Sequence, residues 1–146
     1  MTQKDKELLL KDLCARLPYG VKAKLGDNPN IFDLEYRIKF AAMYGDSDKL
    51  EDILDITNIR PYLFPLSSMT EEMLEELNAN GFFKYRDTIA NVSHLESKNG
   101  IREEVYTYLD IECISFLIEY FRSHHIDYRG LIEKGLALDA TRLNIY

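Results

Sequence analysis

Residues 32–40 read Phe32-Asp-Leu-Glu-Tyr-Arg-Ile-Lys-Phe40, and apolar and charged side chains alternate along the whole stretch. Side chains on a β-strand point alternately to the two faces of the sheet, so this alternation predicts a strand with one apolar and one charged face. A sheet with one buried and one solvated face is typical of antiparallel pairing. The fold prediction starts from this strand.

The preceding stretch, residues 19–25, alternates in the same way, with Val21, Ala23 and Leu25 on its apolar face. Residues 26–30 read Gly-Asp-Asn-Pro-Asn, which is a dense turn signal. Because only a turn separates the two strands, we expect them to pair antiparallel.

Two amphipathic patterns predict helices that cover the apolar face of this sheet. In residues 4–17 leucines recur every four positions, and residues 111–123 carry a wide apolar stripe. The basic residues of the first helix, Arg16 among them, are expected to be solvated. Cys14 and Cys113 both fall within apolar patterns, so we expect buried, reduced thiols.

The middle of the chain carries two further signals. Thr70 can cap a helix that ends near Gly81. Residues 59–66 contain two prolines, which neither an interior helix nor a central strand tolerates. This segment is therefore expected to be a helical turn, capped by Thr57 or Asn58, followed by an extended crossing.

The remaining segments give weaker patterns. Residues 82–108 read as strands and loops, with Asn99-Gly100 as a hairpin turn. Asp127 is expected to cap a short helix over residues 130–134, and residues 49–56 fit a short helix poorly. Together these patterns predict an α+β fold, a small antiparallel sheet with one face covered by two or three helices, in one domain spanning the chain.

The charge of the chain is acidic and unevenly distributed. It has 18 Lys+Arg against 25 Asp+Glu, a formal net charge of −7, and the segment 46–80 alone sums to −7. Binding to nucleic acid needs a surplus of cations on one face, so nucleic acid is an unlikely partner. No apolar stretch approaches about 18 residues and no secretion signal is present, so we expect no membrane span and a cytoplasmic location.

Three stretches of the chain are distinctive in wording and order: Leu8-Leu-Leu-Lys-Asp-Leu-Cys-Ala-Arg-Leu-Pro-Tyr-Gly-Val-Lys22, Ile59-Arg-Pro-Tyr-Leu-Phe-Pro-Leu-Ser-Ser-Met-Thr-Glu-Glu72 and His124-His-Ile-Asp-Tyr-Arg-Gly-Leu-Ile-Glu-Lys-Gly-Leu-Ala-Leu-Asp-Ala140. Together they resemble a family of small uncharacterised proteins of gut Bacteroidales, often found in phage or prophage neighbourhoods. The resemblance implies a bacterial or phage cytoplasmic setting and supplies no catalytic residue.

One group of residues could bind a metal ion. His124, His125 and Asp127, with Cys113, are of the types that hold zinc, which needs three or four ligands converging at about 2.0–2.3 Å. Adjacent histidines on a helix diverge by about 100°, and histidine near a helix C-terminus has an ordinary role at the negative end of the dipole. No phosphate-binding glycine loop is present, so no cofactor is predicted.

The aromatic residues suggest a different role. Tyrosine and arginine in irregular segments often anchor protein partners, although the same residues can pin loops onto the core. The candidate partner-binding residues are Arg60, Tyr62, Phe64, His124, His125, Tyr128 and Arg129.

Three functional hypotheses follow. The first is a non-enzymatic interaction protein, an accessory factor of phage or mobile-element origin, in which residues 59–66 and 124–130 meet an unknown host or phage protein. The acidic helix 70–80 could add electrostatic steering. The alternatives are a small metal-dependent hydrolase using His124, His125 and Asp127, and an acidic DNA mimic that occupies a basic protein. The oligomeric state is not predicted.

Overall fold

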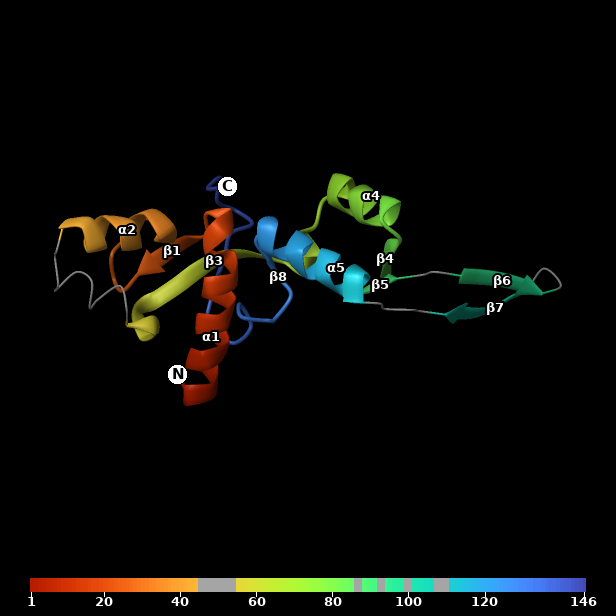
Figure 1. Cartoon of the computed structure of the whole chain (residues 1–146), viewed down its shortest axis with the longest axis horizontal. Coiled ribbons are helices and arrows are strands. Elements are labelled where there is room, and N and C mark those ends of the chain that lie inside the picture. Colours follow the sequence, from red (N-terminus) through yellow and green to blue (C-terminus); the bar gives the residue numbers. More distant parts are fainter. Residues whose placement is uncertain (45–54, 86–87, 92–93, 99–100, 107–110) are drawn as a thin grey trace. The chain divides into compact units, whose positions relative to one another are not determined.

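The computed structural model describes residues 1–44, 55–85, 88–91, 94–98, 101–106 and 111–146 (Figure 1). The chain divides into two compact units, which we describe separately. The first unit is Met1–Pro65 with Phe121–Tyr146, and the second is Leu66–Tyr120. The expectation of a single domain stays a prediction.

The first unit is built from a sheet, two helices and the end of a third. In chain order its elements are α1 (Gln3–Arg16), a 3-10 turn (Leu17–Tyr19), β1 (Lys22–Leu25), β2 (Phe32–Asp33), α2 (Leu34–Tyr44), a 3-10 turn (Ile56–Asn58), β3 (Ile59–Pro65), the last three residues of α5 (Ile111–Ser123), β8 (Ile126–Asp127) and β9 (Leu138–Asp139).

β3 is the strand that holds this sheet together. The sheet has five strands in the order β2-β1-β3-β8, with β9 also paired to β3. β1 pairs antiparallel with β2, as the turn between them predicts, and also with β3. β8 and β9 pair parallel to β3. The α+β class is thus confirmed, with a mixed sheet.

The expectation that the prolines exclude residues 59–66 from a central strand is wrong, because each proline occupies a position where no ladder bond needs its N–H. Pro61 lies opposite Ala23 at the last pair of the β1 ladder, and Pro65 is the last residue of β3. The predicted helical turn is displaced: a 3-10 turn capped by Asp55 occupies Ile56–Asn58, so Thr57 and Asn58 lie inside the turn and do not cap it. The extended crossing predicted to follow the turn is β3 itself.

The strand predicted for residues 32–40 is also mostly wrong. Only Phe32 and Asp33 form a strand, and α2 follows directly. The Asp33 side chain accepts the backbone N–H of Tyr36 and so caps the helix. The residues after it have high helix propensity, and Glu35 and Lys39 form an i,i+4 ion pair.

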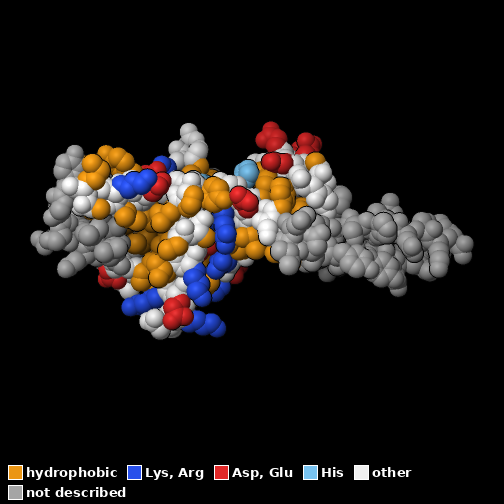
Figure 2. All heavy atoms as spheres, in the orientation of Figure 1, with side chains coloured by type: hydrophobic (Ala, Val, Ile, Leu, Met, Phe, Trp, Pro, Cys, Tyr) orange, Lys and Arg blue, Asp and Glu red, His pale blue; other side chains and the backbone are white. Residues whose placement is uncertain are grey.

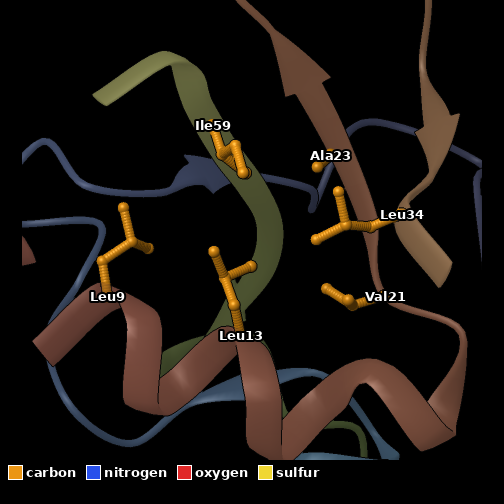
Figure 3. Close-up of a cluster of buried hydrophobic side chains, with 6 residues drawn as sticks. All are labelled: Leu9, Leu13, Val21, Ala23, Leu34 and Ile59. Atoms are coloured by element: carbon orange, nitrogen blue, oxygen red, sulfur yellow. The ribbon is translucent and has the colours of Figure 1, made fainter. Parts of the chain in front are cut away.

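Helix α1 provides the clearest part of the core. Its Leu9 and Leu13 point toward β1 and β3, where they meet Val21, Ala23 and Ile59 (Figure 3). All five are buried, which confirms the predicted apolar face of β1. Each fully buried leucine contributes about 1.5–3 kcal/mol to folding, so α1 is firmly held on the sheet.

The other predicted stripe of α1 is not part of this core. Leu10 is 52% exposed and the Cys14 thiol is free and exposed, so the expectation of a buried thiol is wrong for Cys14. The core uses the stripe through Leu9 and Leu13 instead. The side chain of Cys113 lies outside the described residues.

The second unit contains one short helix and two strand pairs. Thr70 caps its helix as predicted, with its hydroxyl accepting the N–H of Met73. The elements are a 3-10 turn (Leu66–Ser68), α4 (Glu71–Ala79), β4 (Phe82–Tyr85), β5 (Thr88–Asn91), β6 (His94–Lys98), β7 (Ile101–Tyr106) and the first ten residues of α5.

The strands predicted within residues 82–108 are present. β4 pairs antiparallel with β5, and β6 pairs antiparallel with β7. Lys98 lies opposite Ile101, which is the register expected from an intervening two-residue turn, although Asn99-Gly100 itself lies outside the described residues. The ambiguous segment 49–56 falls mostly outside them too.

Helix α5 is confirmed, with different neighbours from those expected. Phe116 stacks on Phe82 of β4, and the Tyr120 hydroxyl donates to the carbonyl oxygen of Met73 in α4. These contacts lie within the second unit and not on the predicted sheet. No helix among the described residues is long and apolar enough to cross a membrane.

The short helix predicted for residues 130–134 is replaced by turns. Asp127 still performs the predicted local role, since its two carboxylate oxygens accept the backbone N–H groups of Leu131 (2.9 Å) and Ile132 (2.8 Å). Gly130 and Gly135 have positive φ, which bends the chain before a helical turn can repeat.

Candidate functional site

A buried ion pair lies at the end of α1. Arg16 Nε donates to Asp12 Oδ2 at 2.7 Å, and both side chains have 0% exposure. The remaining guanidinium N–H groups donate to the carbonyl oxygens of Phe121 (3.2 Å) and Ile126 (2.8 Å). Arg16 thus joins α1 to the end of α5 and to β8.

The expectation that Arg16 is solvated is therefore wrong. Positions 9, 12, 13 and 16 follow the i, i+3, i+4, i+7 spacing of a single helix face, so Asp12 and Arg16 share a face with Leu9 and Leu13. Opposite charges four residues apart on an apolar face are the signal that could have identified this pair from the sequence.

Tyr128 is surrounded by arginines. The guanidinium carbons of Arg16 and Arg129 lie 5.4 and 5.2 Å from the centre of its ring, within the range of cation–π attraction. Arg122 Nε donates to the Tyr128 hydroxyl at 3.3 Å, and Phe121 stacks on the ring. Tyr128, one of the predicted partner-binding residues, thus contacts three arginine side chains of the same chain.

Arg129 is the outermost member of this group. Its Nε lies 3.4 Å from Asp12 Oδ1, an ion-pair contact without hydrogen-bond geometry, and its side chain is 26% exposed. We name Asp12, Arg16, Arg122, Tyr128 and Arg129 the arginine cluster. The buried Asp12 carboxylate contacts the guanidinium groups of Arg16 and Arg129, and Arg122 reaches the cluster through the Tyr128 hydroxyl.

His125 lies beside this cluster with its ring against Tyr146. The two rings stack with centres 3.7 Å apart, and His125 is only 5% exposed. Burial lowers the pKa of His125 to about 4, helped by the positive charges of Arg16, His124 and Lys22, and opposed by a hydrogen bond with the backbone of Tyr19. The imidazole is neutral at pH 7.

The possible metal ligands are committed to other contacts. The His125 ring is stacked, Asp127 accepts two backbone N–H groups, and His124 Nδ1 lies 3.2 Å from the Ser123 hydroxyl. Among the described residues, no group of three or more His, Cys, Asp or Glu side chains could hold a metal ion.

The predicted partner-binding residues divide by burial. Tyr62 is 8% exposed and His125 5%, so their side chains make internal contacts. The half-buried residues are Arg60, Phe64, His124, Tyr128 and Arg129. Arg60 Nη1 donates to the carbonyl oxygens of Thr57 and Ile59, both at 2.9 Å, which anchors the turn before β3.

The sequence prediction missed the most exposed apolar residues. Tyr36 is 66% exposed, Phe40 38% and Met43 78%, and the three follow the i, i+4, i+7 spacing along α2. The opposite side of α2 carries the buried Leu34 and Ala41. A helix with apolar residues on both sides was the signal, and it was hidden by the strand-like alternation.

No protein-family model matches this chain, and neither a curated protein nor a solved structure matches it.

Proposed function

We propose that the protein is a non-enzymatic interaction factor that binds another protein through the exposed side of α2. The observation that carries this proposal is the exposure of Tyr36, Phe40 and Met43, which we name the α2 stripe. Figure 2 shows hydrophobic side chains at the surface in the region of α2.

The composition of the α2 stripe supports binding to protein. Tyrosine, phenylalanine and methionine are enriched in protein interfaces, and scattered single residues are the norm on a surface that binds nothing. Here the rings of Tyr36 and Phe40 already lie 6.1 Å apart, so they present one continuous apolar area. Glu35 and Lys39 beside them offer a charged rim.

The partner-binding surface predicted from the sequence, residues 59–66 and 124–130, contributes one further residue to this proposal. Within residues 124–130, the guanidinium of Arg129 is partly exposed and lies over the ring of Tyr128. Arginine is one of the residues that contribute most to binding in protein interfaces. That the partner is a host or phage protein rests on the family resemblance alone.

The proposal is tested by affinity purification of partners from bacterial lysate with the wild-type chain and two matched variants. Met43→Glu places a charge in the α2 stripe, whereas Leu10→Glu changes an exposed apolar residue on α1. We expect one partner to be recovered with wild type and Leu10→Glu and to be reduced at least about tenfold with Met43→Glu. Equal recovery by all three chains would contradict the proposal.

A separate measurement tests whether the protein associates with itself. Sedimentation of the purified protein shows whether the partner is a second copy of the chain, in which case Met43→Glu converts a dimer to a monomer. A monomer that recovers no partner contradicts the interaction proposal as a whole.

A second candidate, an acidic protein that occupies a basic partner or mimics DNA, is favoured by the second unit. That unit has four basic and eleven acidic residues and so carries the entire net charge of −7. Acidic side chains gather over α4 in Figure 2, where Glu71, Glu72, Glu75 and Glu76 are exposed. This candidate predicts partner binding that weakens steeply as salt increases from 50 to 200 mM, at roughly the steepness of other charge-driven complexes.

A further inference from the structure

The hydroxyl of Tyr146 occupies a position that the sheet would otherwise fill with a backbone hydrogen bond. In the β1–β3 ladder, Lys24 lies opposite Arg60 and Ala23 opposite Pro61, so Lys22 and Tyr62 would form the next pair. Instead the Lys22 N–H donates to the Tyr146 hydroxyl at 2.9 Å, and this hydroxyl donates to the Tyr62 carbonyl oxygen at 2.8 Å.

The alternation of the ladder explains why this position needs a partner. Antiparallel pairs alternate between hydrogen-bonded and non-bonded, and the Gly26 N–H donates to Asn58 in the same register. Gly26–Asn58 and Lys24–Arg60 are therefore hydrogen-bonded positions, and in the same alternation the Lys22–Tyr62 position is one in which backbone hydrogen bonds would form. The Tyr146 hydroxyl therefore bridges the Lys22 N–H and the Tyr62 carbonyl oxygen at a position where the two strands do not bond directly.

The aromatic ring of Tyr146 is held as specifically as its hydroxyl. It stacks on His125 with an angle of 17° between the ring planes, and Phe64 lies 5.7 Å away at 57°. His125 has φ of +55°, a conformation that costs a non-glycine residue roughly 1–2 kcal/mol. The fold thus maintains a strained backbone at the residue that provides the stacking face.

The phenol of Tyr146 is largely buried, and burial raises its pKa to about 12, but the residue as a whole is not enclosed. Tyr146 is 41% exposed as a residue, and residues 141–144, which lead to it, are exposed. Before them the chain is anchored by the buried Ala140, whose N–H donates to Leu63. Release of Tyr146 therefore requires only local movement of a surface segment, not unfolding of the core.

We propose that four groups form a binding site for para-substituted phenols, the side-chain chemistry of tyrosine. They are the Lys22 N–H, the Tyr62 carbonyl, the face of the His125 ring and the tilted ring of Phe64. In this structure Tyr146 fills the site. A phenol supplied from outside occupies it when Tyr146 is displaced. This inference does not depend on the α2 stripe, and it gives the molecule a second binding site.

The site should reject rings that lack the hydroxyl. A benzene or phenylalanine ring can stack on His125 but leaves the Lys22 N–H and the Tyr62 carbonyl unpaired. Sites built to hydrogen-bond a substrate hydroxyl discriminate strongly against the analogue without it. Loss of one such bond is worth about tenfold in affinity or more.

The test uses the full chain with Tyr146→Ala, which removes the phenol group and leaves its site. We expect the melting temperature to fall by about 5 °C and phenol to restore most of this loss in a saturable way. In wild type, phenol competes with Tyr146, so saturable stabilisation should require a higher phenol concentration. Benzene should bind at least about tenfold more weakly than phenol. Leu143→Ala, which removes an exposed apolar side chain of the same segment and leaves Tyr146 in place, is the matched control and should respond to phenol as wild type does.

A second arm distinguishes a free phenol from a tyrosine of another polypeptide. A peptide of residues 140–146 and its tyrosine-to-phenylalanine version are titrated into Tyr146→Ala by calorimetry. Tighter binding of the tyrosine peptide than of phenol identifies a polypeptide as the natural source. Binding of phenol alone identifies a small molecule.

Two results would overturn the inference: Tyr146→Ala binds neither probe saturably, or benzene binds as well as phenol. If Tyr146→Ala does not fold, Tyr146→Phe supplies the same test because its ring keeps the site packed. Phenol in excess should then displace the phenylalanine ring and stabilise Tyr146→Phe more than wild type, and identical responses of the two chains would reject the proposed site.

Discussion

The two units of this protein use charge in opposite ways. The first unit contains fourteen basic and fourteen acidic residues, and its Asp12–Arg16 pair is fully buried. The second contains four basic and eleven acidic residues, and the described glutamates of α4 are exposed.

This difference separates structural charge from surface charge. A buried ion is strongly coupled to stability, because removing its partner leaves an uncompensated charge in a medium of low polarity. An exposed carboxylate is solvated whether or not the protein is folded, and it acts mainly on the field around the molecule. Charge changes at the buried Asp12–Arg16 pair should therefore alter folding, and those at the exposed glutamates of α4 should alter association.

The largest effect is expected when the buried ion pair is broken. Asp12→Ala leaves Arg16 charged and buried, so the free energy of unfolding should fall by about 3–5 kcal/mol in urea titrations. Glu7→Ala, at an exposed position on the same helix, is the control and should change it by less than about 0.5 kcal/mol. Similar effects of the two substitutions would erase the distinction between structural and surface charge.

The next effect concerns His125 and pH. Its pKa in the folded protein is about 4, below the ordinary value of 6.5, so the unfolded chain takes up the proton first as the pH falls. The free energy of unfolding should therefore decrease between pH 6.5 and 4, by up to about 3 kcal/mol from this residue.

The contribution of His125 is measured as a difference between variants. Urea unfolding at pH 7.5, 6 and 5 should show a flatter pH dependence for His125→Gln than for wild type, while His124→Gln stays close to wild type. Parallel curves for wild type and His125→Gln would show that the buried imidazole does not govern acid stability.

A smaller effect is expected in the second unit, where a backbone cap matters more than charge. Thr70→Ala removes the acceptor for the Met73 N–H and should cost about 1 kcal/mol, whereas Thr70→Ser keeps the hydroxyl and should cost less. Amide hydrogen exchange in α4 measures the change locally. Equal protection in both variants would mean that the cap does not stabilise this helix.

The smallest effect is expected for the exposed glutamates. Glu75→Gln should leave the free energy of unfolding within about 0.5 kcal/mol of wild type. If the second unit binds a basic partner, the same substitution should lower the association rate at low salt and have less effect at high salt. A large decrease in the free energy of unfolding would show that Glu75 stabilises the fold, and would contradict the difference proposed between the buried ion pair and the exposed glutamates.

Much of the fold was predictable because its signals are local. The caps, the helical stripes of α1 and α5 and the strands around Asn99-Gly100 each depend on residues a few positions apart. The strict alternation of residues 32–40 misled because the same residues also fit a helix, with Leu34, Ile38 and Ala41 on its buried side. Only the short β2 pairing and the Asp33 cap decide between the two.

The functional surfaces were less predictable. The sequence singled out residues around His125 and Tyr128 as candidates, and of these His125 is buried while His124, Tyr128 and Arg129 are half-buried. The α2 stripe was hidden by the mistaken strand. The role of Tyr146 could not be inferred, because nothing in its neighbours along the chain indicates which strands it lies between.

By itself, the sequence determined the α+β class and the elements whose stabilising bonds join residues close along the chain, such as the helix that Thr70 caps. The tertiary structure decided which polar groups become internal. Arg16 bonds to Ile126, 110 residues away, and Tyr146 bonds to Lys22 and Tyr62, 124 and 84 residues away. The physical reason is that a buried polar group needs a hydrogen-bond partner within about 3 Å, and folding decides which distant residue comes that close. The residues next to the polar group in the sequence do not indicate which residue that is.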